Sequence, residues 1–219
     1  MVVNPLVFGI LPSLIWLIFF LFEDKEHPEP KRMILYVFIA GALSTALAAA
    51  PEIYIQRIFS LGGDLTSSLS LLFSFALIEE LAKFVAVYIV ISKSKFFDER
   101  VDGMVYMITA GLGFAALENI FNLIGTDFIV QVTLIRGIGA TLLHALSSGL
   151  VGFYWMRGRL IEGLFFATIL HAVFNYLILN LGGIEVYASL LLFLAAIIIF
   201  HDFEILKKKD SNKMKRRSL

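Results

Sequence analysis

The sequence predicts an all-α fold, a polytopic membrane helix bundle, and three observations support it. Of the 219 residues, 59% are hydrophobic and only 16% are charged, with a mean hydropathy of +0.86, whereas soluble domains carry charge on about a quarter of their residues. Seven apolar stretches approach the roughly 20 residues that a membrane-spanning helix needs. Basic residues gather in alternate breaks between these stretches. We therefore expect about seven transmembrane helices in a single integral membrane domain, residues 1–219.

Short polar breaks rich in Gly, Pro and charged residues separate the predicted spans. The spans lie at about 4–22, 33–55, 66–92, 104–124, 128–154, 164–182 and 184–203. The first stretch has no basic residue ahead of it, and an acidic, Pro-containing segment follows it. We therefore interpret it as a span rather than as a signal peptide. Segment 51–60 mixes apolar and polar residues, and we expect it along the outer interface.

The distribution of Lys and Arg predicts the orientation of the chain. Fifteen basic residues, including the tail after Leu206, fall on one side of the predicted spans, and only Arg57 falls on the other. Because basic residues near span ends stay in the cytoplasm, we expect a cytoplasmic C-terminus, with its basic tail at about 204–219, and an external N-terminus. Such a tail is typical of an anchor at anionic lipid, which makes membrane lipids expected partners.

Overall charge and cysteine content exclude several classes of function. Eighteen basic residues balance eighteen acidic ones, so the net charge of zero gives no indication of a nucleic-acid partner. The sequence contains no cysteine. A thiol nucleophile, a disulfide framework and a Cys-ligated metal centre are therefore excluded.

Polar and ionisable residues lie inside four neighbouring spans, where each charge costs at least about 2.5–3.5 kcal/mol on insertion scales. Most of them fall at a similar depth near mid-membrane when each residue adds about 1.5 Å, while Arg136 falls nearer the outer face. This convergence predicts a four-helix catalytic core at about 66–182. The residues are Glu79, Glu80 and Lys83 in the third span, Glu118 and Asn119 in the fourth, Arg136 and His144 in the fifth, and His171 and Asn175 in the sixth.

Helical spacing indicates which of these side chains share a face. His171 and Asn175 are four residues apart, as are Glu79 and Lys83, so each pair lies on one side of its helix. Adjacent Glu79 and Glu80 diverge by about 100° around the helix axis. We therefore expect one glutamate to face the site and the other to pair with Lys83 or Arg136.

Carboxylates, imidazoles and an amide without a cysteine favour activation of water over covalent catalysis. Carboxylate oxygen and imidazole nitrogen are ordinary zinc ligands, and zinc lowers the pKa of a water molecule towards about 7. The Asn175 amide is suited to stabilise a developing oxyanion. A metal-free site, with Glu79 as general base and a histidine as its partner, is also chemically workable, but we expect Zn²⁺ to assist.

Four short motifs occur along the same spans in a characteristic order. They are E-E-x-x-K at Glu79, Glu80 and Lys83; F-x-x-x-E-N at Phe114, Glu118 and Asn119; Arg136 followed eight residues later by His144; and H-x-x-x-N at His171 and Asn175. Together they resemble the PrsW family, within the superfamily of CAAX prenyl endopeptidases and bacteriocin-processing intramembrane proteases. Glu118 stands where the CAAX branch usually has a histidine, which favours the PrsW branch.

This resemblance implies an intramembrane protease of a prokaryotic cytoplasmic membrane. Its expected substrate is a single-pass membrane protein, typically an anti-sigma factor, and Glu79 and Glu80 would be its essential pair. We assign Glu79 as general base and Glu80 as the partner of Lys83. The expected ligands of Zn²⁺, or of water in a metal-free site, are Glu118, His144 and His171, with Asn175 as oxyanion donor and Lys83, Asn119 and Arg136 in support.

Two other classes of function compete with the protease. A proton-coupled transporter also uses intramembrane Glu, His and Arg. Transporters usually show inverted repeats and broken helices, but no internal repeat is evident here and no proline interrupts a catalytic span. A membrane scaffold would need no ionisable cluster.

Overall fold

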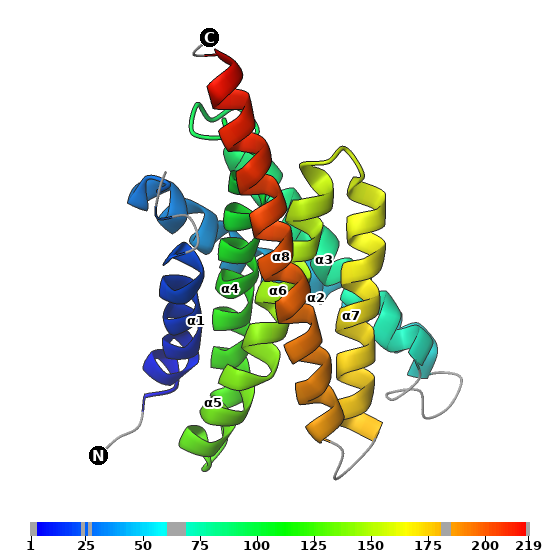
Figure 1. Cartoon of the computed structure of the whole chain (residues 1–219). Coiled ribbons are helices and arrows are strands. Elements are labelled where there is room, and N and C mark those ends of the chain that lie inside the picture. The colour runs from blue at the N-terminus through cyan, green and yellow to red at the C-terminus, as the bar shows by residue number, and fades with distance from the viewer. Residues whose placement is uncertain (1–3, 23–24, 26–27, 61–68, 181–184, 218–219) are drawn as a thin grey trace.

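The computed structural model describes residues 4–22, 25, 28–60, 69–180 and 185–217, and within these ranges it contains helices and no strand. Figure 1 shows them as a bundle, which confirms the predicted fold class. The eight helices are α1 (Pro5–Leu21), α2 (Lys31–Ser60), α3 (Leu69–Ile91), α4 (Val101–Leu123), α5 (Ile129–Ile138), α6 (Ala140–Trp155), α7 (Leu160–Asn180) and α8 (Glu185–Arg217).

The helices reproduce the order of the predicted spans. Five spans are long and apolar enough to cross a membrane: Lys31–Ile58, Val101–Leu123, Ile129–Trp155, Leu160–Leu179 and Val186–Ser211. The other two helices, α1 and α3, do not meet these requirements for a membrane span, for different reasons. α1 has only 17 residues, whereas α3 has 23 residues but carries the three charges of Glu79, Glu80 and Lys83. The molecule is thus a multi-pass membrane protein, and the charges of α3 belong to the candidate site.

Gly139 divides the predicted span 128–154 into α5 and α6. We expected one continuous helix, but the backbone of Gly139 has φ −90° and ψ −90°, outside the α-helical range. Trp16 on α1 donates a hydrogen bond to the carbonyl oxygen of Gly137 at 2.7 Å, and the amide of Leu143 still donates to Gly139 at 2.9 Å. The span therefore bends at Gly139 while its main hydrogen bonds persist.

α4 forms the centre of the bundle. Every residue of its segment 101–116 is buried, and the helix packs against α1, α2 and α6. Two glycines make this packing possible, since a Cβ on Gly113 would lie 2.0 Å from the carbonyl oxygen of Phe38 and one on Gly111 would lie 2.5 Å from that of His144. Such close backbone approach is a common use of glycine in membrane helices. It sets the position of the α6 backbone that carries His144.

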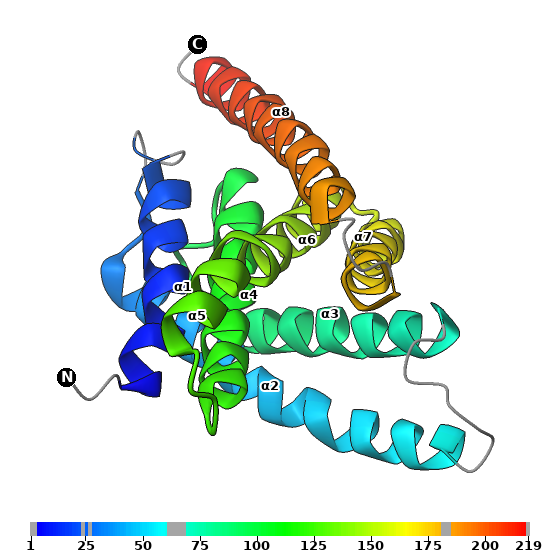
Figure 2. The same ribbon diagram turned by 90° about the horizontal axis from the view of Figure 1, so that it is seen from below.

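The other helices surround α4 with different tilts. Figure 2 shows α2 and α3 side by side and along their lengths, whereas α7 is seen nearly end-on. The two chain termini lie at opposite ends of the molecule in Figure 1. An odd number of membrane crossings requires this arrangement, although the compartment on each side stays a prediction.

The last helix, α8, extends beyond its apolar part and contacts the start of α4. The buried carboxylate of Asp210 accepts hydrogen bonds from the backbone amides of Arg100 (2.9 Å) and Val101 (3.3 Å). A carboxylate at this position pairs with the amides that a helix N-terminus leaves free. The basic end of the chain is therefore fastened to the central helix, in addition to its expected contact with lipid.

We expect Gly113→Ala to lower the free energy of unfolding by about 1–3 kcal/mol, the usual range for overpacking a tight interior. The added methyl group would meet the Phe38 carbonyl at 2.0 Å, and backbone cannot rotate away as a side chain can. Thermal unfolding in detergent measures the change.

Gly149→Ala is the matched control. Gly149 is also buried, on α6, but its Cβ would meet only side-chain atoms, the ends of Ile199 at 3.0 Å and Ile108 at 3.3 Å. A melting temperature lowered equally by both substitutions would contradict the close α2–α4 contact.

Candidate active site

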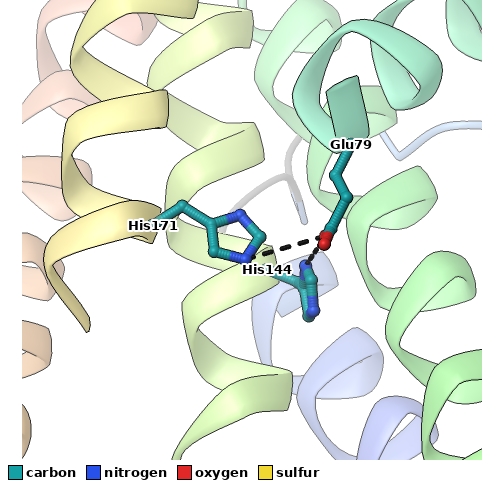
Figure 3. A group of neighbouring side chains, drawn as sticks. All are labelled: Glu79, His144 and His171. Atoms are coloured by element: carbon teal, nitrogen blue, oxygen red, sulfur yellow. Dashed lines mark ion pairs between the residues drawn. The ribbon is translucent and has the colours of Figure 1, made fainter. Parts of the chain in front are cut away.

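Three side chains from three helices converge inside the bundle. They are Glu79 on α3, His144 on α6 and His171 on α7, and Figure 3 shows the two imidazole rings facing the glutamate carboxylate. Oε2 of Glu79 lies 3.9 Å from Nδ1 of His144 and 3.6 Å from Nε2 of His171. The two rings are perpendicular, with centroids 5.0 Å apart. The predicted convergence of the third, fifth and sixth spans is therefore present in the structure.

Glu80 lies behind this group as a fully buried anchor. Its Oε1 accepts hydrogen bonds from the Lys83 ammonium (2.7 Å), the Ser147 hydroxyl (2.8 Å) and the His171 ring (Nδ1, 3.0 Å). These donors come from α3, α6 and α7. The two adjacent glutamates thus divide as expected: Glu79 faces the centre and Glu80 pairs with Lys83.

The partners of each histidine determine which ring nitrogen carries the proton. His171 Nδ1 faces the Glu80 carboxylate and donates to it, so Nε2 presents its lone pair towards Glu79. In His144 the order is reversed. Lys83 has only donors, so Nδ1 accepts at 2.9 Å, and Nε2 donates to Oε2 of Glu118 at 2.8 Å. One lone pair of each ring therefore points into the centre.

Glu118 holds His144 and is itself held by a cation. Its Oε1 lies 2.8 Å from Nη2 of Arg136. Arg136 Nε donates to the Asn119 side chain at 2.7 Å, and Asn119 donates to Thr141 at 2.9 Å. This chain of contacts joins α4, α5 and α6, and it assigns Glu118, Asn119 and Arg136 to a supporting layer outside the group of three.

Asn175 lies one turn after His171 on α7, as its spacing predicts. Its side chain is half-buried, and it makes no hydrogen bond among the residues that the structure describes. Its amide group is therefore not engaged by the residues that the structure describes. Among the described residues, Asn175 forms no hydrogen bond with the other site residues.

Glu52 on α2 is a further carboxylate that the motifs do not include. Its Oε1 is buried without a hydrogen-bond partner in the described part of the chain. It lies within electrostatic range of Glu79, Glu118 and Lys83. Sequence reasoning passes over Glu52 because its span is expected to end at 55, close to water, whereas α2 continues as a helix to Ser60.

The group of three fits a divalent metal ion. Each of Glu79, His144 and His171 offers one ligand atom, and these atoms all lie within 4.8 Å of one another, with the oxygen and nitrogen donors that zinc accepts. Oε2 of Glu79 is buried and lacks a hydrogen-bond partner among the described residues, and a bound cation would supply one. This group differs in one member from the ligand set that the sequence predicted. The predicted set contained Glu118, whereas the geometry brings Glu79 to the two histidines.

Comparisons with known proteins agree on one family. Residues 29–200 match a family described as PrsW family intramembrane metalloprotease. Protease PrsW of Geobacillus kaustophilus is 31% identical over 181 residues, 78% of each chain. The Bacillus subtilis protein of the same name is 32% identical over 154 residues, 69% of this chain and 67% of its own. That of Clostridioides difficile is 24% identical over 205 residues, 87% and 84%. No solved structure matches this chain.

We expect Arg136→Gln to lower the free energy of unfolding by about 1–3 kcal/mol, because it leaves the Glu118 carboxylate without its cation. The Glu118 side chain is only 31% exposed, so water replaces the lost partner incompletely. Arg159→Gln breaks an exposed pair with Glu162 and is the control, with an expected effect of about 0–1 kcal/mol. Equal destabilisation in thermal unfolding would contradict a structural role for the Arg136 pair.

Proposed function

The chain belongs to the PrsW family of intramembrane metalloproteases, and from this membership we propose that it cleaves a membrane-anchored protein with water activated at Glu79, His144 and His171. The protein is a peptidase. The observation that carries the proposed site is the convergence of one unpartnered carboxylate oxygen and two imidazole lone pairs.

Glu79, His144 and His171 would hold the metal ion. When bound, zinc lowers the pKa of a water molecule and polarises a carbonyl group. Glu80 accepts a hydrogen bond from the ring N–H of His171, and Glu118 accepts one from that of His144. This arrangement orients metal-binding histidines in proteins. We therefore reassign Glu118 from ligand to orienting residue. In a metal-free site, Oε2 of Glu79 would instead take the proton from water.

The proposed substrate is a membrane-anchored protein resembling an anti-sigma factor, with its apolar segment beside α7. A groove of about 590 Å³ opens there, lined mainly by apolar residues of α5, α6, α7 and α8. On α7 the groove is lined by Phe174, Leu177 and Ile178, and Asn175 is not among its lining residues. The amide of Asn175, on the same helix, is suited to stabilise a developing oxyanion.

We expect Glu79→Gln to reduce cleavage of a single-pass reporter by at least 100-fold, because the amide neither accepts a proton from water nor neutralises a metal. Reporter cleavage is measured for the purified wild type, Glu79→Gln, Glu118→Gln and the exposed control Glu162→Gln. Each protein is tested in detergent with and without a chelator. Full cleavage by Glu79→Gln would overturn the site assignment. Cleavage that resists the chelator, with no metal by elemental analysis, would favour the metal-free mechanism, whereas proton flux into liposomes lost in the same variants would favour a transporter.

The predicted orientation is testable because the chain contains no cysteine. Single cysteines at Lys95, in the segment between α3 and α4, and at Arg57, near the end of α2, report the two sides of the membrane. We expect a membrane-impermeant maleimide to label Arg57→Cys in intact cells and Lys95→Cys only after lysis. The reverse labelling pattern would show that the orientation in the membrane is opposite to the predicted one.

A further inference from the structure

We propose that the ammonium group of Lys83 is an internal cation of the site that occupies the metal-facing nitrogen of His144, so that metal binding requires Lys83 to withdraw. This inference rests on the proposed metal-assisted function. It concerns Lys83, which belongs to the E-E-x-x-K motif but is not one of the proposed metal ligands.

Lys83 is completely buried, and its contacts are those of a bound cation. Its Nζ lies 2.7 Å from Oε1 of Glu80, 2.9 Å from Nδ1 of His144 and 3.8 Å from Oε2 of Glu79. The ring of Phe114 lies below it, with the centroid 4.6 Å away. Two of the three residues that would bind a metal ion thus already face a positive charge.

Lys83 and a metal ion compete for the same lone pair. A neutral imidazole has one nitrogen that accepts, and in His144 this is Nδ1, because Nε2 donates to Glu118. Zinc bonds to such a nitrogen at about 2.0–2.1 Å, which is shorter than the 2.9 Å between Nδ1 and Lys83. The ion and the ammonium group therefore cannot use Nδ1 together.

The structure also offers Lys83 a position to which it can withdraw. Oε2 of Glu80 is buried and lacks a partner among the described residues, although Oε1 already contacts Lys83. The flexible four-carbon stem of lysine allows its ammonium to move between neighbouring acceptors. Lys83 can therefore leave His144 and remain paired with Glu80.

The consequence is a site that stays neutralised without metal and binds metal only in exchange. While Lys83 occupies Nδ1, that lone pair is protected and His144 keeps the tautomer that metal binding needs. Removing the positive charge of Lys83 should therefore tighten metal binding. A purely structural lysine would give the opposite result, because its loss would loosen the histidine and weaken binding.

The test measures zinc affinity by competition with a chromophoric chelator, using the purified full-length protein in detergent. We expect Lys83→Met, which is unbranched and neutral, to bind Zn²⁺ at least tenfold more tightly than the wild type. Lys83→Arg keeps the charge and should bind no more tightly than the wild type. Lys95→Met, on the exposed segment between α3 and α4, is the control and should leave the affinity unchanged.

Affinity in Lys83→Met that is equal to or weaker than that of the wild type would overturn the inference. If this variant fails to fold, Lys83→Gln replaces it, because glutamine retains a donor for Glu80 without the charge, and the same tenfold criterion applies. Reporter cleavage by the wild type is measured in parallel. Cleavage without zinc binding in any protein would overturn the inference while leaving the peptidase with a metal-free mechanism.

Discussion

The site depends on one buried carboxylate oxygen, Oε1 of Glu80. It accepts three hydrogen bonds, from Lys83, Ser147 and His171, and so links α3, α6 and α7. A membrane interior offers little water to replace a lost partner, so a charge at zero exposure is tolerated only when nearby donors neutralise it. This requirement fixes the rotation of all three helices and brings the two histidines together.

Carboxylates behind the histidines extend this arrangement outwards. Glu80 orients His171, and Glu118 orients His144. Arg136 then connects Glu118 to Asn119. Close packing of the central helix α4 against α6 positions Glu118 next to His144. The geometry at the centre is therefore a consequence of hydrogen bonds and helix packing across most of the bundle.

The charges around the centre explain why it suits a cation. The carboxylates of Glu79, Glu80 and Glu118 gather there, and in the described part of the chain the Lys and Arg side chains paired with them are Lys83 and Arg136. Lys83 supplies positive charge from within the site, which connects its burial to the proposed exchange with metal.

The sequence alone determined the fold class, the order of the spans and membership of the family, because apolar length and motif order are local properties of the chain. It also singled out the ionisable residues that the structure brings together from α3, α6 and α7, since each is unusual inside an apolar span. Only the tertiary structure decided that Glu79 rather than Glu118 faces both histidines, that α2 adds Glu52 and that the fifth span bends at Gly139. Helical spacing gives the angle between side chains on one helix, but the rotation and tilt of each helix depend on packing against the others. That packing places Lys83 on the nitrogen that a metal ion would need.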